Sequence, residues 1–434
     1  MTRPAAQRSE SVFTDFKHAY GKPQALAEAN RCLYCEDAPC ITACPTSINI
    51  PEFIRKIATD NVKGSARTIF EANILGMSCA RVCPVETLCV GDCVYNHLDA
   101  PPIQIGKLQR YATDAAFDKG WSFFEAGPDT GKSIGLIGAG PASLAAAHEL
   151  RRYGHACTIY EKREVVGGLN STGVAPYKMK ADRAVQEVEW ILSIGGIDVQ
   201  TGVQVGQDVR LEELETRHDA VFFGAGLGED RYLGASGEDL TGVHGAVEWI
   251  EAMKLGEVDI SGVSSAAVVG GGNTAIDAVR ELLGLGIPQV TMIYRGGEAG
   301  MSGYQHEWSE AKREGALAAW GCQPTALEGD GAVERVCCDV LDADKQPIEG
   351  EQVVLSANLV LLAIGQGKLG NLLGGLDGIE LQWGRIVTDE VGATGRPGWF
   401  AGGDAANGGK EVVNAAAEGK AAAHAIHIYL EARS

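Results

Sequence analysis

The chain has 434 residues, of which 45% are hydrophobic and 22% charged, and this length predicts about three domains because it exceeds what one hydrophobic core supports. Its net charge of −20 argues against nucleic acid or an anionic membrane as a partner. Residues 1–10 contain no apolar signal segment and no later stretch is apolar enough to span a bilayer, so we expect a cytoplasmic protein.

The first part of the chain, residues 1–128, shows helical patterns such as Pro51 to Thr59 and little β-branched alternation, which predicts a small α-helical domain. Eight of the 12 cysteines lie in it, between residues 32 and 93. Grouped thiols in a long chain without a signal segment indicate metal binding rather than disulfides. The other four, Cys157, Cys322, Cys337 and Cys338, have no motif spacing and are interpreted as core residues.

The eight cysteines form two runs, Cys32-x2-Cys35-x4-Cys40-x3-Cys44-Pro45 and Cys79-x3-Cys83-Pro84-x4-Cys89-x3-Cys93. Zinc also takes four-cysteine sites, but it usually pairs two separated C-x2-C elements, so the spacing favours two 4Fe-4S clusters. In two-cluster arrangements the last cysteine of a run binds the other cluster. We therefore expect one cluster on Cys32, Cys35, Cys40 and Cys93, and the other on Cys44, Cys83, Cys89 and a fourth ligand, which counting alone assigns to Cys79.

A loop at 126–131 leads into a predicted strand, Ser133 to Ile137, and a helix from Pro141 to Tyr153. The turn between them predicts a dinucleotide site, because amides at the helix N-terminus receive a pyrophosphate. Glu161 ends the next strand, where a carboxylate binds the adenosine ribose. The candidate binding residues of this site are Gly138, Gly140, Pro141, Ala142, Ser143, Glu161, Gly168 and Leu169.

The same strand-turn-helix pattern returns at Ser265 to Val269, with a helix through Leu283 and a further strand from Gln289 to Tyr294. Arg295 follows this strand, at the position where an acid favours NADH and a basic cluster favours NADPH. A single basic residue favours NADH slightly, with NADPH as the alternative and a solvated loop charge as the plain interpretation of Arg295. The candidate residues of this second site are Gly270, Gly272, Asn273, Thr274 and Arg295.

Late in the chain, apolar segments at 359–364 and 399–401 run into turns, and an Ala-rich helix is predicted from about Glu411 to Leu430. Gly403 and Asp404 stand at a strand end, a position suited to hydrogen-bonding the polyol chain of a flavin, although Asp404 as a helix N-cap is equally ordinary. The helix that follows, with Val412 in its first turn, would present its N-terminal amides to the flavin ring.

These motifs resemble the electron-input subunits of bacterial NAD-dependent dihydropyrimidine dehydrogenases, with the glutamate synthase small subunit as a near relative. The resemblance covers residues 15–432 and includes Arg31 to Cys40, Cys79 to Pro84, Gly138 to Ser143, Ala401 to Asp404 and Gly409 to Val413. It implies a helical two-cluster iron-sulfur domain followed by two Rossmann-like domains, for FAD and NAD, of the glutathione and adrenodoxin reductase type. The implied boundaries are 1–128 for the iron-sulfur domain, 129–240 with 366–434 for the FAD domain, and 241–365 for the NAD(P)H domain.

The resemblance also implies residue roles. Dihydropyrimidine dehydrogenases use a glutamine as an unusual cluster ligand, and the matching residue is Gln109, which would replace Cys79 beside Cys44, Cys83 and Cys89. The glutamate synthase relative carries Glu there. Met301 to Tyr304, with Glu307, falls where relatives approach the nicotinamide, but the Met-Pro-Ala form common there is absent.

The implied activity is oxidation of NADH at FAD, with electrons leaving through the clusters to an FMN-containing partner subunit that reduces uracil or thymine. No catalytic acid or base is assigned, because the flavin accepts the hydride itself. A glutamate synthase input subunit using NADPH, or a stand-alone NAD(P)H:acceptor oxidoreductase, is the alternative. A disulfide reductase would need a paired redox C-x4-C or C-x2-C beside one nucleotide site, and none stands there; a non-enzymatic redox sensor is a third class.

Overall fold

The computed structural model describes residues 4–256, 258–367, 369, 373 and 376–433. The chain consists of two compact units. One unit contains residues 15–171, 181–227 and 368–434, and the other contains residues 1–14, 172–180 and 228–367. The short segment 172–180 thus belongs to the second unit, although the residues before and after it in sequence belong to the first. Among the described residues, no helix is long and apolar enough to cross a bilayer.

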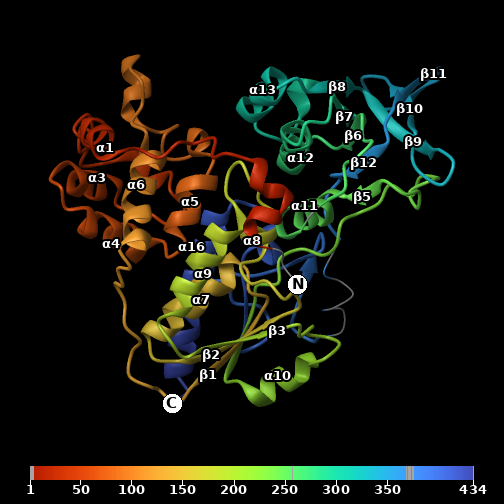
Figure 1. Ribbon diagram of the computed structural model, residues 1–434. Helices are drawn as coiled ribbons and strands as arrows, with labels where there is room; N and C mark the ends of the chain where they lie inside the picture. The colour runs from red at the N-terminus through yellow and green to blue at the C-terminus, as the bar shows by residue number, and fades with distance from the viewer. Residues whose placement is uncertain (1–3, 257, 368, 370–372, 374–375, 434) are drawn as a thin grey trace. The chain divides into compact units, whose positions relative to one another are not determined.

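The first part of the larger unit is helical, as the sequence predicts (orange in Figure 1). Its helices are α1 (Lys22–Ala29), α2 (Pro39–Thr42), α3 (Ile50–Ala58), α4 (Val62–Ala72), α5 (Gly76–Val82) and α6 (Ile105–Asp118), with 3-10 turns η3 (Val85–Thr87) and η4 (Val94–Leu98). Side-chain caps begin two of them: Asn49 accepts the Glu52 N–H at 3.1 Å and Asn61 accepts the Gly64 N–H at 2.9 Å. Helix α3 buries Phe53, Ile54 and Ile57 on one face, which is the amphipathic pattern of a packed helix.

A five-stranded parallel sheet follows in the same unit, in the order β15-β4-β1-β2-β3. Its strands are β1 (Ser133–Ile137), β2 (Ala156–Glu161), β3 (Ile197–Thr201), β4 (Ala220–Phe223) and β15 (Trp399–Ala401). The helices of this part are α7 (Pro141–Arg152), α8 (Leu169–Thr172), α9 (Ala181–Leu192), α10 (Leu211–Arg217), α15 (Asp404–Asn407) and α16 (Val412–Glu431), and a hairpin pairs β13 (Leu381–Gln382) with β14 (Arg385–Ile386). All residues of β4 are buried, as parallel strands covered on both faces require.

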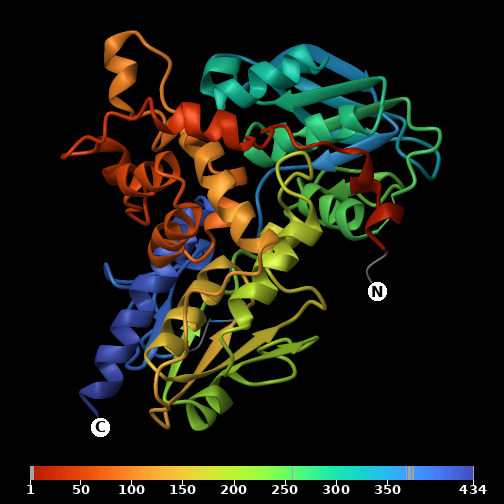
Figure 2. The ribbon, with the colours of Figure 1, turned by 60° about the vertical axis from the view of Figure 1, so that its left-hand side comes forward.

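Helix α16, blue in Figure 2, packs along α7. The approach is so close that a Cβ on Gly419 would lie 2.1 Å from the Ala142 carbonyl oxygen, so only glycine fits there. The buried core is continuous from the helical part to this sheet, and it includes Phe70, whose ring centroid lies 4.5 Å from that of Trp190. The sequence predicts a domain boundary after residue 128, and the structure packs the two sides of that boundary around one core.

The smaller unit repeats the same design. Its parallel sheet has the order β5-β12-β6-β7-β8 and consists of β5 (Val243–Gly245), β6 (Ser265–Val269), β7 (Gln289–Tyr294), β8 (Leu317–Trp320) and β12 (Leu359–Leu362). The helices are α11 (Ala246–Leu255), α12 (Asn273–Gly284) and α13 (Gln305–Arg313), with 3-10 turns η1 (Ala5–Gln7), η2 (Ser9–Val12) and η5 (Glu298–Gly300). An antiparallel sheet adds β9 (Cys322–Glu328), β10 (Arg335–Leu341) and β11 (Pro347–Ser356). Four strands have the same order in the two sheets, β4-β1-β2-β3 and β12-β6-β7-β8, whereas the edge strand is the last in sequence in one sheet (β15) and the first in the other (β5). The shared four-strand order confirms the predicted pair of Rossmann-like domains.

Candidate cofactor sites

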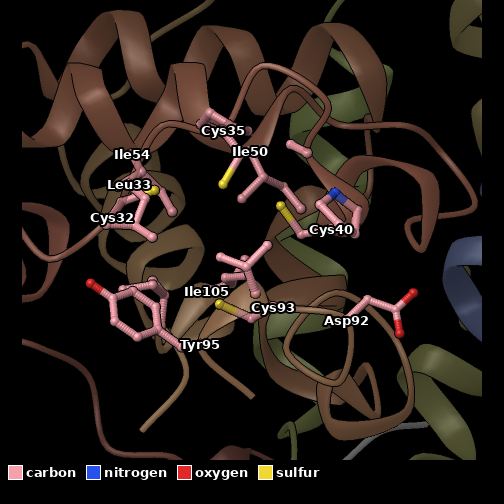
Figure 3. A pocket seen from close by; sticks show the side chains of 15 residues that line it. Cys32, Leu33, Cys35, Cys40, Ile50, Ile54, Asp92, Cys93, Tyr95 and Ile105 are labelled. Atoms are coloured by element: carbon pink, nitrogen blue, oxygen red, sulfur yellow. The ribbon is translucent and has the colours of Figure 1, made fainter. Parts of the chain in front are cut away.

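Four cysteines from the two runs line one pocket of the helical domain (Figure 3). They are Cys32 and Cys35 after α1, Cys40 in α2 and Cys93 before η4, the set expected for the first cluster. The sulfur atoms of Cys35, Cys40 and Cys93 point into the same space. The hollow encloses about 370 Å³ including its open mouth, and its other walls are Leu33, Ala38, Pro39, Ile50, Pro51, Ile54, Asp92, Val94, Tyr95, Ile103 and Ile105.

The surroundings of these thiols determine what they can bind. Burial, with neighbouring thiolates as a further cause, raises the pKa of Cys40 to about 12 and also raises the pKa of Cys32. Thiols in an apolar hollow stay protonated, whereas a coordinated metal removes the proton outright. Among the described residues, no three His, Cys, Asp or Glu side chains lie close enough to chelate a single metal ion. A spread set of four cysteines fits an iron-sulfur cube, which binds its thiolates on different iron atoms.

In the second group Cys44 and Cys83 are buried and Cys89 is half-buried. Burial, and then the charges of Cys83 and Cys44, raise the pKa of Cys89 above its usual range, so these thiols lie within electrostatic range of one another. Cys40 of the first pocket also contributes to this shift, which makes the two groups neighbours. The structure therefore brings together the three cysteines expected for the second cluster.

The structure holds both candidates for the fourth ligand beside α5. Cys79 lies within α5, where its sulfur accepts a hydrogen bond from the Asn73 side-chain amide at 3.2 Å, and its hydrogen bond to Cys83 helps to raise the pKa of that thiol. Gln109 of α6 is buried, and its Nε2 donates to the Gly76 carbonyl at 2.7 Å. Because the nitrogen is bound, the oxygen is the atom of this amide that remains for a metal.

A residue that the sequence analysis missed holds α5 in place. Glu187 of α9 is fully buried, and its carboxylate accepts the N–H of Met77 at 2.8 Å and the N–H of Ser78 at 3.2 Å, together with the Ser78 hydroxyl. These are first-turn amides of α5, which otherwise have no partner within the helix. Burial raises the pKa of Glu187 to about 7 against the opposing effect of these bonds. Capping patterns in a sequence join residues about three positions apart, whereas Glu187 lies 110 residues after Met77, so no sequence pattern predicts this contact.

The first glycine-rich turn has the shape that a dinucleotide requires. Gly138 has φ +85°, and a Cβ on it would lie 2.6 Å from the Ala225 Cα. Gly140 is the N-cap of α7, and a Cβ there would meet only the Gly224 oxygen, at 3.7 Å. The turn therefore needs glycine at its first position and is open at its second, where a pyrophosphate would approach the helix N-terminus. Ser143 is buried, and its Oγ has no hydrogen-bond partner among the described residues.

The other predicted residues of this site surround that turn. Glu161 ends β2, and its carboxylate accepts the Ala139 N–H at 2.7 Å and the Arg163 N–H at 2.9 Å. It therefore supports the turn directly and also has the position expected for contact with a ribose. Gly168 lies beside the turn, since a Cβ on it would be 2.9 Å from the Gly140 Cα. Pro141 and Ala142 open α7, and Leu169 opens α8.

The segment after β15 forms the second wall of this site. The N-cap of α15 is Gly403 and not Asp404, and no side chain caps the helix. Burial and then the Glu418 charge raise the pKa of Asp404 to about 6. Glu418 accepts the Gly403 N–H at 2.7 Å, and a Cβ on Gly403 would lie 3.0 Å from that of Ala142. Asp404 is thus half-buried beside the start of α7, and Val412 begins α16 with Glu411 as its N-cap.

The second glycine-rich turn has the same design in the other unit. Gly270 has φ +146°, and a Cβ on it would lie 2.3 Å from the Ala363 oxygen, while Gly272 caps α12 and a Cβ there would meet only the Ser302 Oγ, at 3.6 Å. Asn273 accepts the Tyr304 N–H at 2.9 Å through its side chain, so this predicted binding residue fixes the loop at 301–304. Thr274 is exposed in the first turn of α12, and Arg295 is exposed directly after β7.

The resemblance places Glu307 near the nicotinamide, and in the structure Glu307 takes part in a network of ion pairs around Lys178. Its carboxylate forms an ion pair with Lys178 at 2.8 Å, and Lys178 also pairs with Asp277 at 2.9 Å. The Tyr177 hydroxyl donates to Asp277 as well. Lys178 belongs to the 172–180 segment, so these buried bonds attach that segment to α12 and α13. The partners lie about 100 and 130 residues apart, which is why no local pattern predicts them.

Two known protein families match the chain. The family described as dihydropyrimidine dehydrogenase domain II, 4Fe-4S cluster, matches residues 8–121, and the family described as pyridine nucleotide-disulphide oxidoreductase matches residues 132–419. The chain belongs to the pyridine nucleotide-disulphide oxidoreductase family. This oxidoreductase therefore carries an N-terminal 4Fe-4S domain and a region that binds FAD and a nicotinamide dinucleotide.

Two kinds of relative match the chain over nearly its full length. The NAD-dependent dihydropyrimidine dehydrogenase subunit PreT of Escherichia coli K12 is 35% identical, over 97% of this chain and 98% of that protein. The glutamate synthase [NADPH] small chain of Azospirillum brasilense is 31% identical, over 100% of this chain and 94% of that protein. Among solved structures, the thioredoxin reductase of T. acidophilum has a TM-score of 0.55 at 20% identity and covers 70% of this chain and 100% of that chain. The structural likeness concerns the fold, and it confirms the reductase type of the two nucleotide domains.

Proposed function

We propose that this oxidoreductase is an electron-input subunit that oxidises NADH at FAD and passes electrons through two 4Fe-4S clusters to a partner. The proposed partner is an FMN-containing subunit that reduces uracil or thymine to the dihydropyrimidine. The observation that carries the proposal is the pocket of Cys32, Cys35, Cys40 and Cys93, which lies in the same unit as the first glycine-rich turn. A flavin site and two neighbouring thiol groups in one unit support a relay.

The proposed relay has an order that follows from the contacts of the chain. Helix α16 packs against α5, whose C-cap is Cys83, so the second thiol group lies beside the segment that follows Asp404. Cys89 of that group neighbours Cys40 of the first pocket. Electrons would therefore leave the flavin side near Cys83 and reach the Cys32 pocket last.

The protein's own residues bind and orient in this scheme. The open turns at Gly140 and Gly272 would receive the two pyrophosphates, and half-buried Asp404 would hold the flavin chain. When bound, the flavin supplies the exchange between a two-electron hydride and single electrons. The chain needs to supply no general acid or base for this reaction, and we assign none.

Two features support NADH and a pyrimidine-reducing partner. A single exposed base, Arg295, follows β7, whereas recognition of a 2′-phosphate favours a basic cluster. Gln109 stands buried beside α5 in place of the Glu of glutamate synthase relatives. The second candidate, an NADPH-oxidising glutamate synthase subunit, rests on full-length relatives at 31% and 32% identity.

Steady-state assays under anaerobic conditions test the proposal. The isolated chain should reduce a dye with NADH faster than with NADPH and should contain FAD and about eight irons, the content of two 4Fe-4S clusters. It should reduce uracil only after addition of the FMN subunit. Uracil reduction by the isolated chain, or productive coupling to a glutamate-forming large subunit instead, would contradict the proposal.

A further inference from the structure

The two thiol groups differ in their access to solvent. In the first group Cys32, Cys35 and Cys40 are half-buried and Cys93 is buried, whereas in the second group Cys89 is half-buried and Cys44 and Cys83 are buried. Three of the four thiols of the first group are thus partly accessible, and they line a pocket with an open mouth. Because electron tunnelling slows steeply with distance, a partner gains most by docking where the last carrier is nearest to solvent.

Exposed apolar side chains surround that mouth. Between residues 15 and 128, the large hydrophobic side chains that are exposed are Phe16, Leu33, Tyr34 and Leu98. Leu33 lines the pocket and is 53% exposed (Figure 3). Leu98, 61% exposed, ends the turn η4, whose Tyr95 also lines the pocket. Exposed apolar groups gathered at one place indicate an interaction site more than scattered ones do.

The loop that presents Leu33 is fixed in shape. Tyr34 has φ +53°, a left-handed conformation that is uncommon for a bulky residue. Its hydroxyl donates to the Ala29 carbonyl at 3.1 Å, and the Tyr95 hydroxyl donates to the Arg31 carbonyl at 2.7 Å. These bonds tie the loop to α1 and to η4. A surface held in one shape loses little conformational entropy when a partner docks.

The rim of the mouth is acidic. Glu36, Asp37 and Asp92 are exposed, and Asp92 lines the pocket. Arg55, whose charge acts on Tyr34, is a cation on this side, while Arg31 is paired with Glu28 at 2.8 Å. An apolar centre with an acidic rim fits a partner with an apolar centre and a basic rim.

We propose that the electron-accepting partner subunit docks on the pocket-mouth face, formed by Leu33, Tyr34, Glu36, Asp37, Asp92 and Leu98. This inference rests on the proposed function and adds where the partner binds and what its surface must carry. The partner is an electron-accepting protein with Lys or Arg around an apolar contact.

Variants outside the lining of the pocket test the docking face. Asp37→Lys and Leu98→Ser alter the rim and the apolar centre, and Glu212→Lys and Ile428→Ser make matched changes at exposed positions elsewhere in the same unit. The probes are the FMN-containing pyrimidine-reducing subunit and, as the other source, the glutamate synthase large subunit. Binding of the oxidised chain to each is measured by calorimetry without NADH, together with iron content and NADH:dye turnover.

We expect the FMN-containing subunit to bind the wild type, with an affinity that falls as salt rises. The double variant Asp37→Lys/Leu98→Ser should raise the Kd about tenfold or more, and Asp37→Lys alone should flatten the salt dependence. Iron content and dye turnover should match the wild type, and both controls should bind normally. Unchanged binding by the double variant, or binding of neither subunit to a dye-active wild type, would overturn the docking face. Loss of dye turnover in the wild type would instead count against the proposed function.

Discussion

Three hydrogen bonds join Glu187 and Ser78: the Ser78 N–H donates to both carboxylate oxygens, and the Ser78 hydroxyl donates to one of them. The pair joins α9 of the sheet-containing part to the first turn of α5 in the helical part. Because α5 also carries Cys79 and ends at Cys83, this contact fixes the helix that presents the second thiol group.

Replacing Glu187 by Ala should loosen α5, because buried amides lose their acceptor at a cost of about 1–3 kcal/mol. We expect a lower melting temperature and partial loss of iron on purification. Glu187→Gln keeps one acceptor oxygen and should retain more iron than Ala, and Glu189→Ala, exposed on the same helix, is the control. Full iron and unchanged melting in Glu187→Ala would remove this role for the carboxylate.

Cys79 and Gln109 make opposite predictions for iron content. If Gln109 is the fourth ligand, Cys79→Ser should leave the iron content intact, because Cys79 then serves only as a hydrogen-bond partner of Asn73 and Cys83. Gln109→Ala should lower the iron content and change the electron paramagnetic resonance of the reduced protein. Loss of about half the iron in Cys79→Ser, with Gln109→Ala unaffected, would reverse the assignment.

Gly270→Ala should weaken binding of the nicotinamide dinucleotide while FAD and iron stay bound. The new Cβ would lie 2.3 Å from the Ala363 oxygen at φ +146°, so the turn must deform. We expect the KM for NADH to rise about tenfold or more, which corresponds to about 1.4 kcal/mol. Gly297→Ala is a matched control, since its Cβ would meet nothing within 4 Å. A normal KM in Gly270→Ala would place the dinucleotide elsewhere.

Lys254 gives the smaller unit a pH-dependent stability. It is fully buried and donates to the carbonyls of Val174 at 2.6 Å and Met179 at 3.1 Å, and burial lowers its pKa to about 8 despite Glu10, Glu281 and Asp277. The unfolded chain therefore binds more protons than the folded chain between pH 8 and about 10.4, so this contribution to stability rises with pH across that window, by up to about 3 kcal/mol.

Thermal melts of wild type and Lys254→Met from pH 7.5 to 10 measure that contribution. The melting temperature of the wild type should rise with pH relative to that of the variant, and Lys63→Met, at an exposed lysine, should not alter the profile. Parallel profiles of wild type and Lys254→Met would contradict the assignment.

Local patterns were sufficient for the repeated architecture. The predicted strands Ser133 to Ile137 and Ser265 to Val269 match β1 and β6 residue for residue, because short apolar runs between glycine turns have few other conformations. The late helix, expected from about Glu411 to Leu430, is α16 at Val412–Glu431. The crossing of Cys93 into the first run's pocket also followed from spacing, since a short loop reaches only three corners of a cube.

Features that depend on distant pairings were not predictable. From the sequence, Glu187 is one more acid on an amphipathic helix and Lys178 is a charge in a loop. Their partners lie far away in the sequence and come close only in the folded chain. Asp404 could equally have been an N-cap, and the structure gives that position to Gly403. The sequence contains the donors and acceptors of such networks but not their geometry.

The excursion at 172–180 limits how this protein can be re-engineered or recombined. The dinucleotide unit is assembled from 1–14, 172–180 and 228–367, and its buried Lys254 and half-buried Asp277 take their partners from the middle segment. If residues 228–367 alone were exchanged with those of a relative of different coenzyme preference, these charged side chains would lose the partners that segment 172–180 provides. A successful chimera must transplant three stretches of chain together, so coenzyme preference is more readily altered by point changes around Arg295 than by domain exchange.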